Sequence, residues 1–129
     1  MSKVLIVEDE EKLVSYLIPL LQNRGYEVCW AADGKQALEM CPREKPESVL
    51  LDLGLPGEVS GYDVLTQIKQ DTPHTKVVVI TGYSEEHVKN KTISLGADLF
   101  FKKPFIPHKL FSALERLLKE DAGREQGNE

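Results

Sequence analysis

The residue with the clearest chemical potential is a carboxylate at the end of a short apolar run. Asp52 directly follows the Val-Leu-Leu segment at 49–51, and Gly54 and Pro56 indicate that the chain turns just beyond it. Aspartate is a poor strand residue, and a charge at the end of a buried strand is costly unless a partner neutralises it. Taken alone, Asp52 is more simply explained as a helix-capping or loop aspartate.

Four further polar residues lie at or just beyond the ends of other apolar runs: Glu8, Asp9, Thr81 and Lys103. Each has an ordinary explanation by itself. Glu8 and Asp9 fit the negative charge that is favoured at the start of a helix. Thr81 fits a residue at a strand end whose hydroxyl is hydrogen-bonded locally, and Lys103 fits a solvated loop lysine like its neighbour Lys102. These residues would form a functional site only if they converge at one place. Whether they do depends on the strands and helices that carry them.

Those elements alternate between strands and helices. Short apolar runs predict strands over residues 4–7, 27–31, 49–51, 76–80 and 99–101. Apolar periodicity and stop signals predict helices over residues 13–24, 34–41, 62–70, 84–95 and from about 107 onward. Pro42 and Pro46 are expected to end the second helix, and Ser84 to cap the fourth.

This alternation predicts one doubly wound α/β domain of the (βα)5, flavodoxin-like type, with a parallel sheet in the order 2-1-3-4-5. Ligands of such sheets bind at the carboxyl ends of the strands, where the strand order reverses. In this order the acid-bearing ends of the first and third strands are neighbours. Three carboxylates, one hydroxyl and one ammonium are therefore expected on one rim.

Length and composition fit a single domain with an ordinary core, since the chain has 129 residues, 41% of them hydrophobic. The net charge of −5 argues against a nucleic-acid surface, and no apolar run approaches membrane-spanning length. The early acids disfavour a secretory signal. Cys29 and Cys41 lack metal-ligand spacing, so we expect reduced thiols in a cytoplasmic protein. The domain is expected over residues 1–119, with 120–129 as a polar tail or linker start.

The expected rim has a definite chemistry. Crowded carboxylates repel one another by roughly 4 kcal/mol per pair at ~4 Å, so they stay ionised together only if a cation joins them. Hard oxygen ligands suit Mg²⁺, which proteins commonly bind through one or two carboxylates and a phosphate oxygen. A carboxylate, a divalent ion, a lysine and a hydroxyl are also the parts needed to transfer a phosphoryl group onto an aspartate.

At this point the chain resembles the receiver domain of two-component response regulators, up to about residue 119. The matching segments are Glu8-Asp9, Asp52 with Pro56 four residues later, Ile80-Thr81-Gly82, Gly96-Ala97-Asp98 and Lys103-Pro104-Phe105. Each segment alone is a weak signal. Their occurrence in the family's order, each next to a predicted strand, is a specific one.

The resemblance implies a phosphoacceptor and a metal site. Asp52 would take phosphate from a phosphohistidine on a sensor histidine kinase or a histidine phosphotransfer protein. Mg²⁺, or Mn²⁺ in its place, would be held by Asp52, by Asp9 directly, by Glu8 mostly through water and by the backbone carbonyl of Gly54. Such a domain catalyses only its own phosphorylation and dephosphorylation, so we do not expect an enzyme in the ordinary sense.

Thr81 and Lys103 complete the implied catalytic set with Asp52. Thr81 would hydrogen-bond the phosphoryl oxygen once the phosphoryl group is present. Lys103 would pair with that group, and with Asp52 beforehand. The peptide between Lys103 and Pro104 is cis in the family, which is a minority state for a bond to proline.

The resemblance also implies a switch, in which phosphorylation shifts the population between two packings of one face. Thr81 would move toward the phosphate, and an aromatic side chain on the fifth strand, here Phe100, would turn inward. Phe100 fits an ordinary core aromatic as well. A downstream protein partner is expected on the face of Val88, Lys91, Phe100 and Lys102, with no direct contact to nucleic acid or membrane. Whether phosphorylation drives homodimerisation is left open.

The chain departs from the family pattern at two places. Residues 56–61 form a segment one residue longer than the commonest family spacing. The positions two beyond Asp52 and Thr81, which are thought to tune acyl-phosphate hydrolysis in the family, hold Gly54 and Tyr83. Our hypothesis is that Gly54 leaves a path for water open while the Tyr83 ring partly screens it.

Three other functions fit the sequence less well. A metal-dependent phosphatase with Asp52 as nucleophile would want a second acid where Gly54 stands. A flavodoxin-like cofactor binder would want glycine and hydroxyls after the first strand, where four consecutive acids stand instead. A receiver-like interaction module that is never phosphorylated would normally have lost Asp52, an acid or Lys103, and all of them are present.

Overall fold

The computed structural model describes residues 2–83 and 85–127 and shows strands alternating with helices along that length. The strands are β1 (Lys3–Val7), β2 (Glu27–Ala31), β3 (Ser48–Asp52), β4 (Lys76–Thr81) and β5 (Leu99–Lys102). The helices are α1 (Glu11–Asn23), α2 (Gly34–Glu44), α3 (Gly61–Asp71), α4 (Glu86–Ser94) and α5 (Pro107–Gly127). No helix of the described part has both the length and the apolar content needed to span a membrane.

The five strands form one parallel sheet in the order β2-β1-β3-β4-β5, which confirms the predicted fold class and strand order. β1 and β3 lie side by side, with Val7 opposite Leu51. Consequently the residues that follow Val7 and Leu51 emerge at the same edge of the sheet. Asp52, the last residue of β3, lies opposite Ile80 of β4. This register brings the ends of three central strands together.

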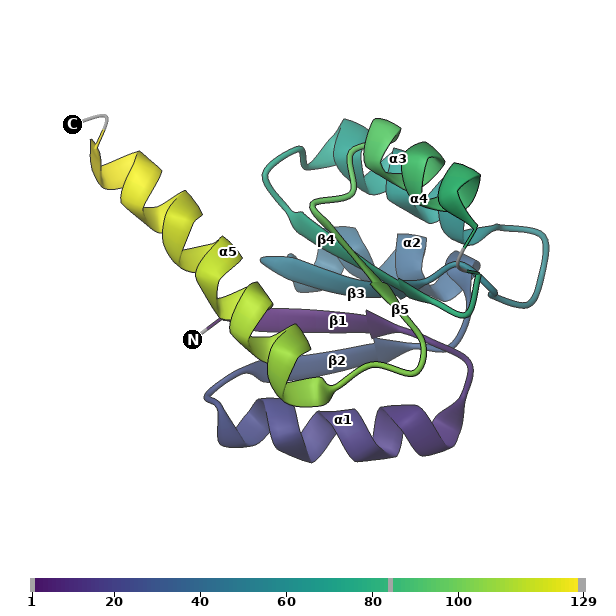
Figure 1. Ribbon diagram of the computed structural model, residues 1–129, viewed down its shortest axis with the longest axis horizontal. Coiled ribbons are helices and arrows are strands. Elements are labelled where there is room, and N and C mark those ends of the chain that lie inside the picture. The colour runs from purple at the N-terminus through teal and green to yellow at the C-terminus, as the bar shows by residue number, and fades with distance from the viewer. Residues whose placement is uncertain (1, 84, 128–129) are drawn as a thin grey trace.

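Each face of the sheet carries its own apolar core (Figure 1). Side chains alternate along a strand, so Leu5 and Val7 face the helices α2, α3 and α4, whereas Val4 and Ile6 face α1 and α5. Strands buried on both faces read as continuous apolar runs, which is why β1, β3 and β4 were recognisable in the sequence.

The helix boundaries follow from local chemistry. The Ser60 hydroxyl accepts from the Asp63 amide while the Asp63 carboxylate accepts from the Ser60 amide, so a capping box begins α3. The prediction that Pro42 ends α2 was wrong, because α2 continues to Glu44. A proline one turn from the helix end removes only one backbone hydrogen bond, so the helix tolerates it there. The predicted cap Ser84 lies outside the described residues.

α5 is the longest helix and begins over the sheet, where Leu110, Phe111 and Leu114 are buried. Its later turns extend beyond the sheet (Figure 1). The helix reaches Gly127, so the backbone of most of the predicted tail is helical. The proposed domain boundary at residue 119 stays a prediction.

A partly buried ion pair holds the amino ends of β4 and β5 together. The Lys69 ammonium at the end of α3 donates to the Asp98 carboxylate and to the Thr75 carbonyl, both at 2.8 Å. The same Asp98 oxygen accepts from the Val77 amide at 2.8 Å. This network ties α3 to the loop before β5 at the edge of the sheet opposite to Asp52.

Candidate functional site

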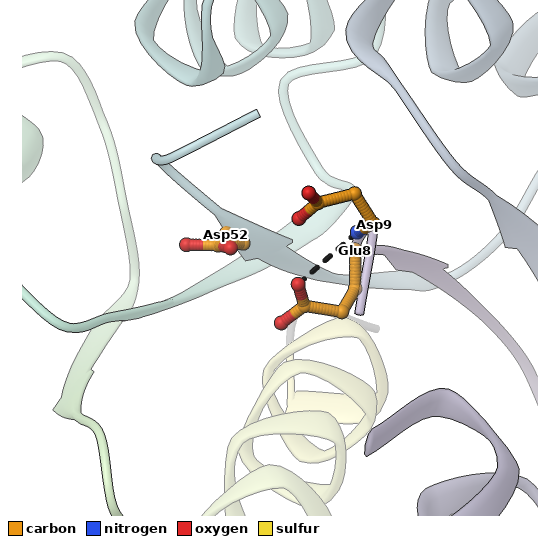
Figure 2. Close-up of side chains that lie close together, drawn as sticks. All are labelled: Glu8, Asp9 and Asp52. Atoms are coloured by element: carbon orange, nitrogen blue, oxygen red, sulfur yellow. Dashed lines mark hydrogen bonds between the residues drawn. The ribbon is translucent and has the colours of Figure 1, made fainter. Parts of the chain in front are cut away.

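Three carboxylates gather at the carboxyl edge of the sheet. Glu8 and Asp9 follow β1, and Asp52 ends β3. Each offers one oxygen atom, and these atoms all lie within 4.8 Å of one another (Figure 2). The structure therefore brings together the acids that the strand order placed at neighbouring ends. Three hard oxygen donors at this spacing fit the ligand preference of Mg²⁺.

Glu8 is the most buried of these acids, with 0% of its surface exposed. One carboxylate oxygen accepts from the Lys103 ammonium at 2.5 Å, and the other accepts from the amides of Asp9 and Glu10 at 3.1 and 3.2 Å. Burial raises the pKa of Glu8 to about 7, and the charge of Asp52 adds to this effect, although the hydrogen bond from Lys103 lowers it. Glu8 is therefore more than a charge at a helix start.

Lys103 faces two carboxylates at once. Its ammonium lies 2.5 Å from Glu8 and 3.3 Å from Asp52, and its side chain is largely buried. Burial lowers its pKa, but the hydrogen bond to Glu8 and the charge of Asp52 outweigh burial and raise it overall. The peptide between Lys103 and Pro104 is cis, as the resemblance implied. Lys103 is thus not the solvated loop lysine that its sequence position alone permitted.

Asp52 is held in place by backbone contacts. It is only 6% exposed, and the amide of Gly54 donates to its Oδ1 atom at 3.1 Å. A β-carbon at Gly61 would lie 2.6 Å from the Leu53 Cα and 2.9 Å from the Asp52 carbonyl oxygen. Only glycine lets the start of α3 approach the end of β3 so closely. The predicted role of the Gly54 carbonyl as a metal ligand stays a prediction.

Thr81 and Tyr83 lie on the neighbouring strand end. Thr81 is fully buried, and its hydroxyl oxygen accepts from the amide of Tyr83 at 3.1 Å. Tyr83 is 55% exposed. Its ring stands beside Gly54, because a β-carbon built there would lie 3.7 Å from Tyr83 Cε2 and 3.8 Å from the nearer Asp52 oxygen. The ring thus flanks the approach to Asp52 along Gly54.

One neighbour of the acids was missed by the sequence reasoning. The indole Nε1 of Trp30 donates to the backbone carbonyl of Glu8 at 2.7 Å. The available signal was a lone tryptophan near the end of the second predicted strand, next in order to the strand that carries the acids. The pattern of apolar residues gave no reason to expect a side-chain hydrogen bond to the loop after β1.

The expected partner face is only partly exposed. Val88 of α4 is 8% exposed and packs in the core, and its part in the partner face stays a prediction. Phe100 is partly buried against the same core, which fits the core reading as well as the switch reading. Lys102 is exposed, and the Lys91 ammonium lies 4.1 Å from the centre of the Tyr62 ring.

Comparison with known proteins identifies the family. The family model described as Response regulator receiver domain matches residues 4–115. The chain is 35% identical over 118 residues to the alkaline phosphatase synthesis transcriptional regulatory protein PhoP of Bacillus subtilis. The aligned region covers 92% of this chain and 49% of PhoP. It is 33% identical over 117 residues to sporulation initiation phosphotransferase F of Bacillus subtilis, covering 91% of this chain and 94% of that protein.

A solved structure agrees with these matches. The CheY-like response regulator receiver domain protein from Methanospirillum hungatei JF-1 superposes with a TM-score of 0.91 at 27% identity, covering 96% of this chain and 98% of that one. The chain spans about half the length of PhoP and 57% of the length of RegX3 from Mycolicibacterium smegmatis, to which it is 37% identical over 132 residues. Both the sequence matches and the superposition cover nearly all of this chain, and the chain belongs to the response regulator receiver domain family.

Proposed function

We propose that this receiver domain accepts a phosphoryl group on Asp52 from a phosphohistidine of a sensor histidine kinase or a histidine phosphotransfer protein. The observation that carries the proposal is the placement of Asp52, which is buried at a strand end with the Lys103 ammonium 3.3 Å away. A carboxylate oxygen of Asp52 attacks phosphorus, the bond between phosphorus and the histidine nitrogen breaks, and the imidazole leaves.

The acidic residues beside Asp52 support a metal-dependent reaction. Glu8, Asp9 and Asp52 present oxygen atoms within 4.8 Å of one another, so with the Gly54 carbonyl they would hold Mg²⁺, or Mn²⁺ in its place. The bound ion supplies positive charge that neutralises oxygens of the transferring phosphoryl group. Lys103 supplies a second positive charge on the side of Glu8 and Asp52, and it would follow the phosphoryl oxygens after transfer.

We infer a switch that begins at Thr81. Its hydroxyl is occupied by the amide of Tyr83, and it is buried one strand away from Asp52. Once Asp52 carries a phosphoryl group, the hydroxyl gains a stronger, charged acceptor and turns toward it. This movement of Thr81 pulls the loop before α4. The face formed by α4, β5 and α5, which includes Phe100, Lys91 and Lys102, then repacks.

This face would contact a downstream partner or an output domain. The relatives PhoP and RegX3 are longer than this chain, which matches about half of each, so the receiver domain over residues 1–119 would work as one part of a regulator or alone. We place the protein in the cytoplasm, where sensor kinases present phosphohistidine. Phosphorylation-driven homodimerisation through the same face is a further outcome to test.

Intact mass spectrometry tests the assignment. The protein is incubated with a small phosphodonor such as acetyl phosphate, with Mg²⁺ or with EDTA. Wild type should gain one phosphoryl group only with Mg²⁺, and Asp52→Asn should gain none. Asp71→Asn, which alters an exposed aspartate at the end of α3, is the matched control and should behave as wild type. Equal labelling of wild type and Asp52→Asn would refute the proposed acceptor, and no labelling of either would favour a module that is never phosphorylated.

A further inference from the structure

Trp30 is the chain's single tryptophan and lies beside the acidic turn that follows β1. It sits on the outermost strand β2, opposite Ile6 of β1, and 37% of its surface is exposed. Its indole N–H reaches past the end of β1 and donates to the Glu8 carbonyl at 2.7 Å. This distance is at the short end of the range for an N–H···O hydrogen bond, so the contact is well formed.

The bond fixes one particular peptide group. The Glu8 carbonyl and the Asp9 amide belong to the same planar peptide unit. The carbonyl end accepts from Trp30, and the amide end donates to the Glu8 carboxylate at 3.1 Å. On the other side of Glu8, its own amide donates to the Ala31 carbonyl at 3.1 Å. The peptide unit that carries Asp9 is therefore held at both of its polar ends.

We propose that Trp30 is a positioning residue for the metal site. By holding the peptide between Glu8 and Asp9, it keeps the Asp9 carboxylate directed to the space shared with Asp52. The inference rests on the proposed function, because it assumes that these acids bind a divalent ion. It goes beyond that function in assigning a role to a residue that contributes no ligand atom.

The size of the effect follows from preorganisation. Without the indole donor, the Glu8 carbonyl turns to water for its hydrogen bond, and the turn populates other orientations of that peptide. Metal affinity then falls in proportion to the fraction of molecules that keep the binding-competent turn. The net free energy of one such hydrogen bond corresponds to about a fivefold change in that fraction.

The decisive variant replaces Trp30 by 3-benzothienylalanine, in which sulfur takes the place of the indole N–H while ring size is kept. Trp30→Phe is the simpler companion, and Tyr16→Phe, at an exposed aromatic of α1, is the matched control. Two quantities are measured for each protein. The first is the exchange rate of the Asp9 amide in the metal-free protein by NMR, and the second is the dissociation constant for Mg²⁺ by calorimetry.

We expect both Trp30 variants to show about fivefold faster Asp9 amide exchange and about fivefold weaker Mg²⁺ binding, while Tyr16→Phe matches wild type. If the benzothienyl variant matches wild type in both measurements, the indole donor has no positioning role and the inference is overturned. If wild type itself binds no Mg²⁺, the proposed function fails. The metal-free exchange rates still decide in that case whether Trp30 holds the turn, because equal rates would overturn the inference on their own.

Discussion

Replacing Glu8 by glutamine should stabilise the metal-free protein at neutral and higher pH. Glu8 is fully buried beside Asp52, and the Lys103 ammonium that contacts it is shared with that second acid. Burial raises the pKa of Glu8 from 4.5 to about 7 in the folded state. Ionised Glu8 therefore lowers the free energy of unfolding, and the neutral amide of glutamine removes that cost.

The sign and size follow from proton linkage. Between pH 4.5 and about 7 the folded state retains a proton on Glu8 that the unfolded state has released, so the free energy of unfolding falls as pH rises through this window. The proton on Glu8 contributes its full stabilisation below pH 4.5, and this contribution is lost above a pH of about 7. At about 1.4 kcal/mol per pH unit, the interval from 4.5 to about 7 gives about 3 kcal/mol as the largest expected effect.

Urea unfolding at a series of pH values measures this effect, using metal-free wild type, Glu8→Gln and the control Glu11→Gln, an exposed acid in the first turn of α1. Wild type and Glu8→Gln should be about equally stable near the lower end of the window, and Glu8→Gln should be more stable by up to about 3 kcal/mol above it. Adding Mg²⁺ should recover stability in wild type at high pH. Parallel pH profiles for wild type and Glu8→Gln would refute the reasoning.

Three further predictions concern the site and its scaffold. Tyr83→Ala should shorten the lifetime of the phosphorylated protein severalfold, because the ring flanks the path to Asp52 along Gly54; decay of the phosphorylated mass with time measures it, and an unchanged or longer lifetime would contradict the screening role. Lys69→Met should lower the free energy of unfolding by about 2 kcal/mol, since Asp98 loses its charged partner; a urea midpoint equal to that of wild type would count against this. Gly61→Ala should cost about 1–3 kcal/mol and weaken Mg²⁺ binding, because the added carbon forces the chain away from the end of β3; calorimetry showing wild-type affinity would disprove the coupling.

The sequence was sufficient to predict the sheet and the meeting of the acids, for reasons of topology. Apolar runs at 4–7 and 49–51 mark strands buried on both faces, and right-handed crossovers leave few possible strand orders. The position of Asp52 beside Glu8 and Asp9 follows from the strand order, whatever the side-chain conformations. The cis peptide before Pro104 came from the family resemblance and not from residue patterns.

Details that depend on side-chain direction were beyond the sequence. Lys103 was expected to pair with Asp52, yet its shorter contact is with Glu8, a preference set by where a flexible four-carbon chain ends. The hydrogen bond from the Trp30 indole depends on how β2 and the loop after β1 are placed relative to each other. The periodicity of apolar residues carries no information about that placement. Val88 was placed on the partner face by the family resemblance, which does not show how deeply this side chain is buried.

Because α5 extends beyond the sheet (Figure 1), a small tilt at its base produces a larger movement at its far end. α5 packs against the core as far as Leu118, and residues 119–127 continue as one helix, an arm of ~14 Å at 1.5 Å per residue. A tilt of ~10° at the packed base of α5 would therefore move the far end of this arm by ~2 Å. A sub-ångström rearrangement near the sheet would thus become a displacement large enough for another molecule to sense.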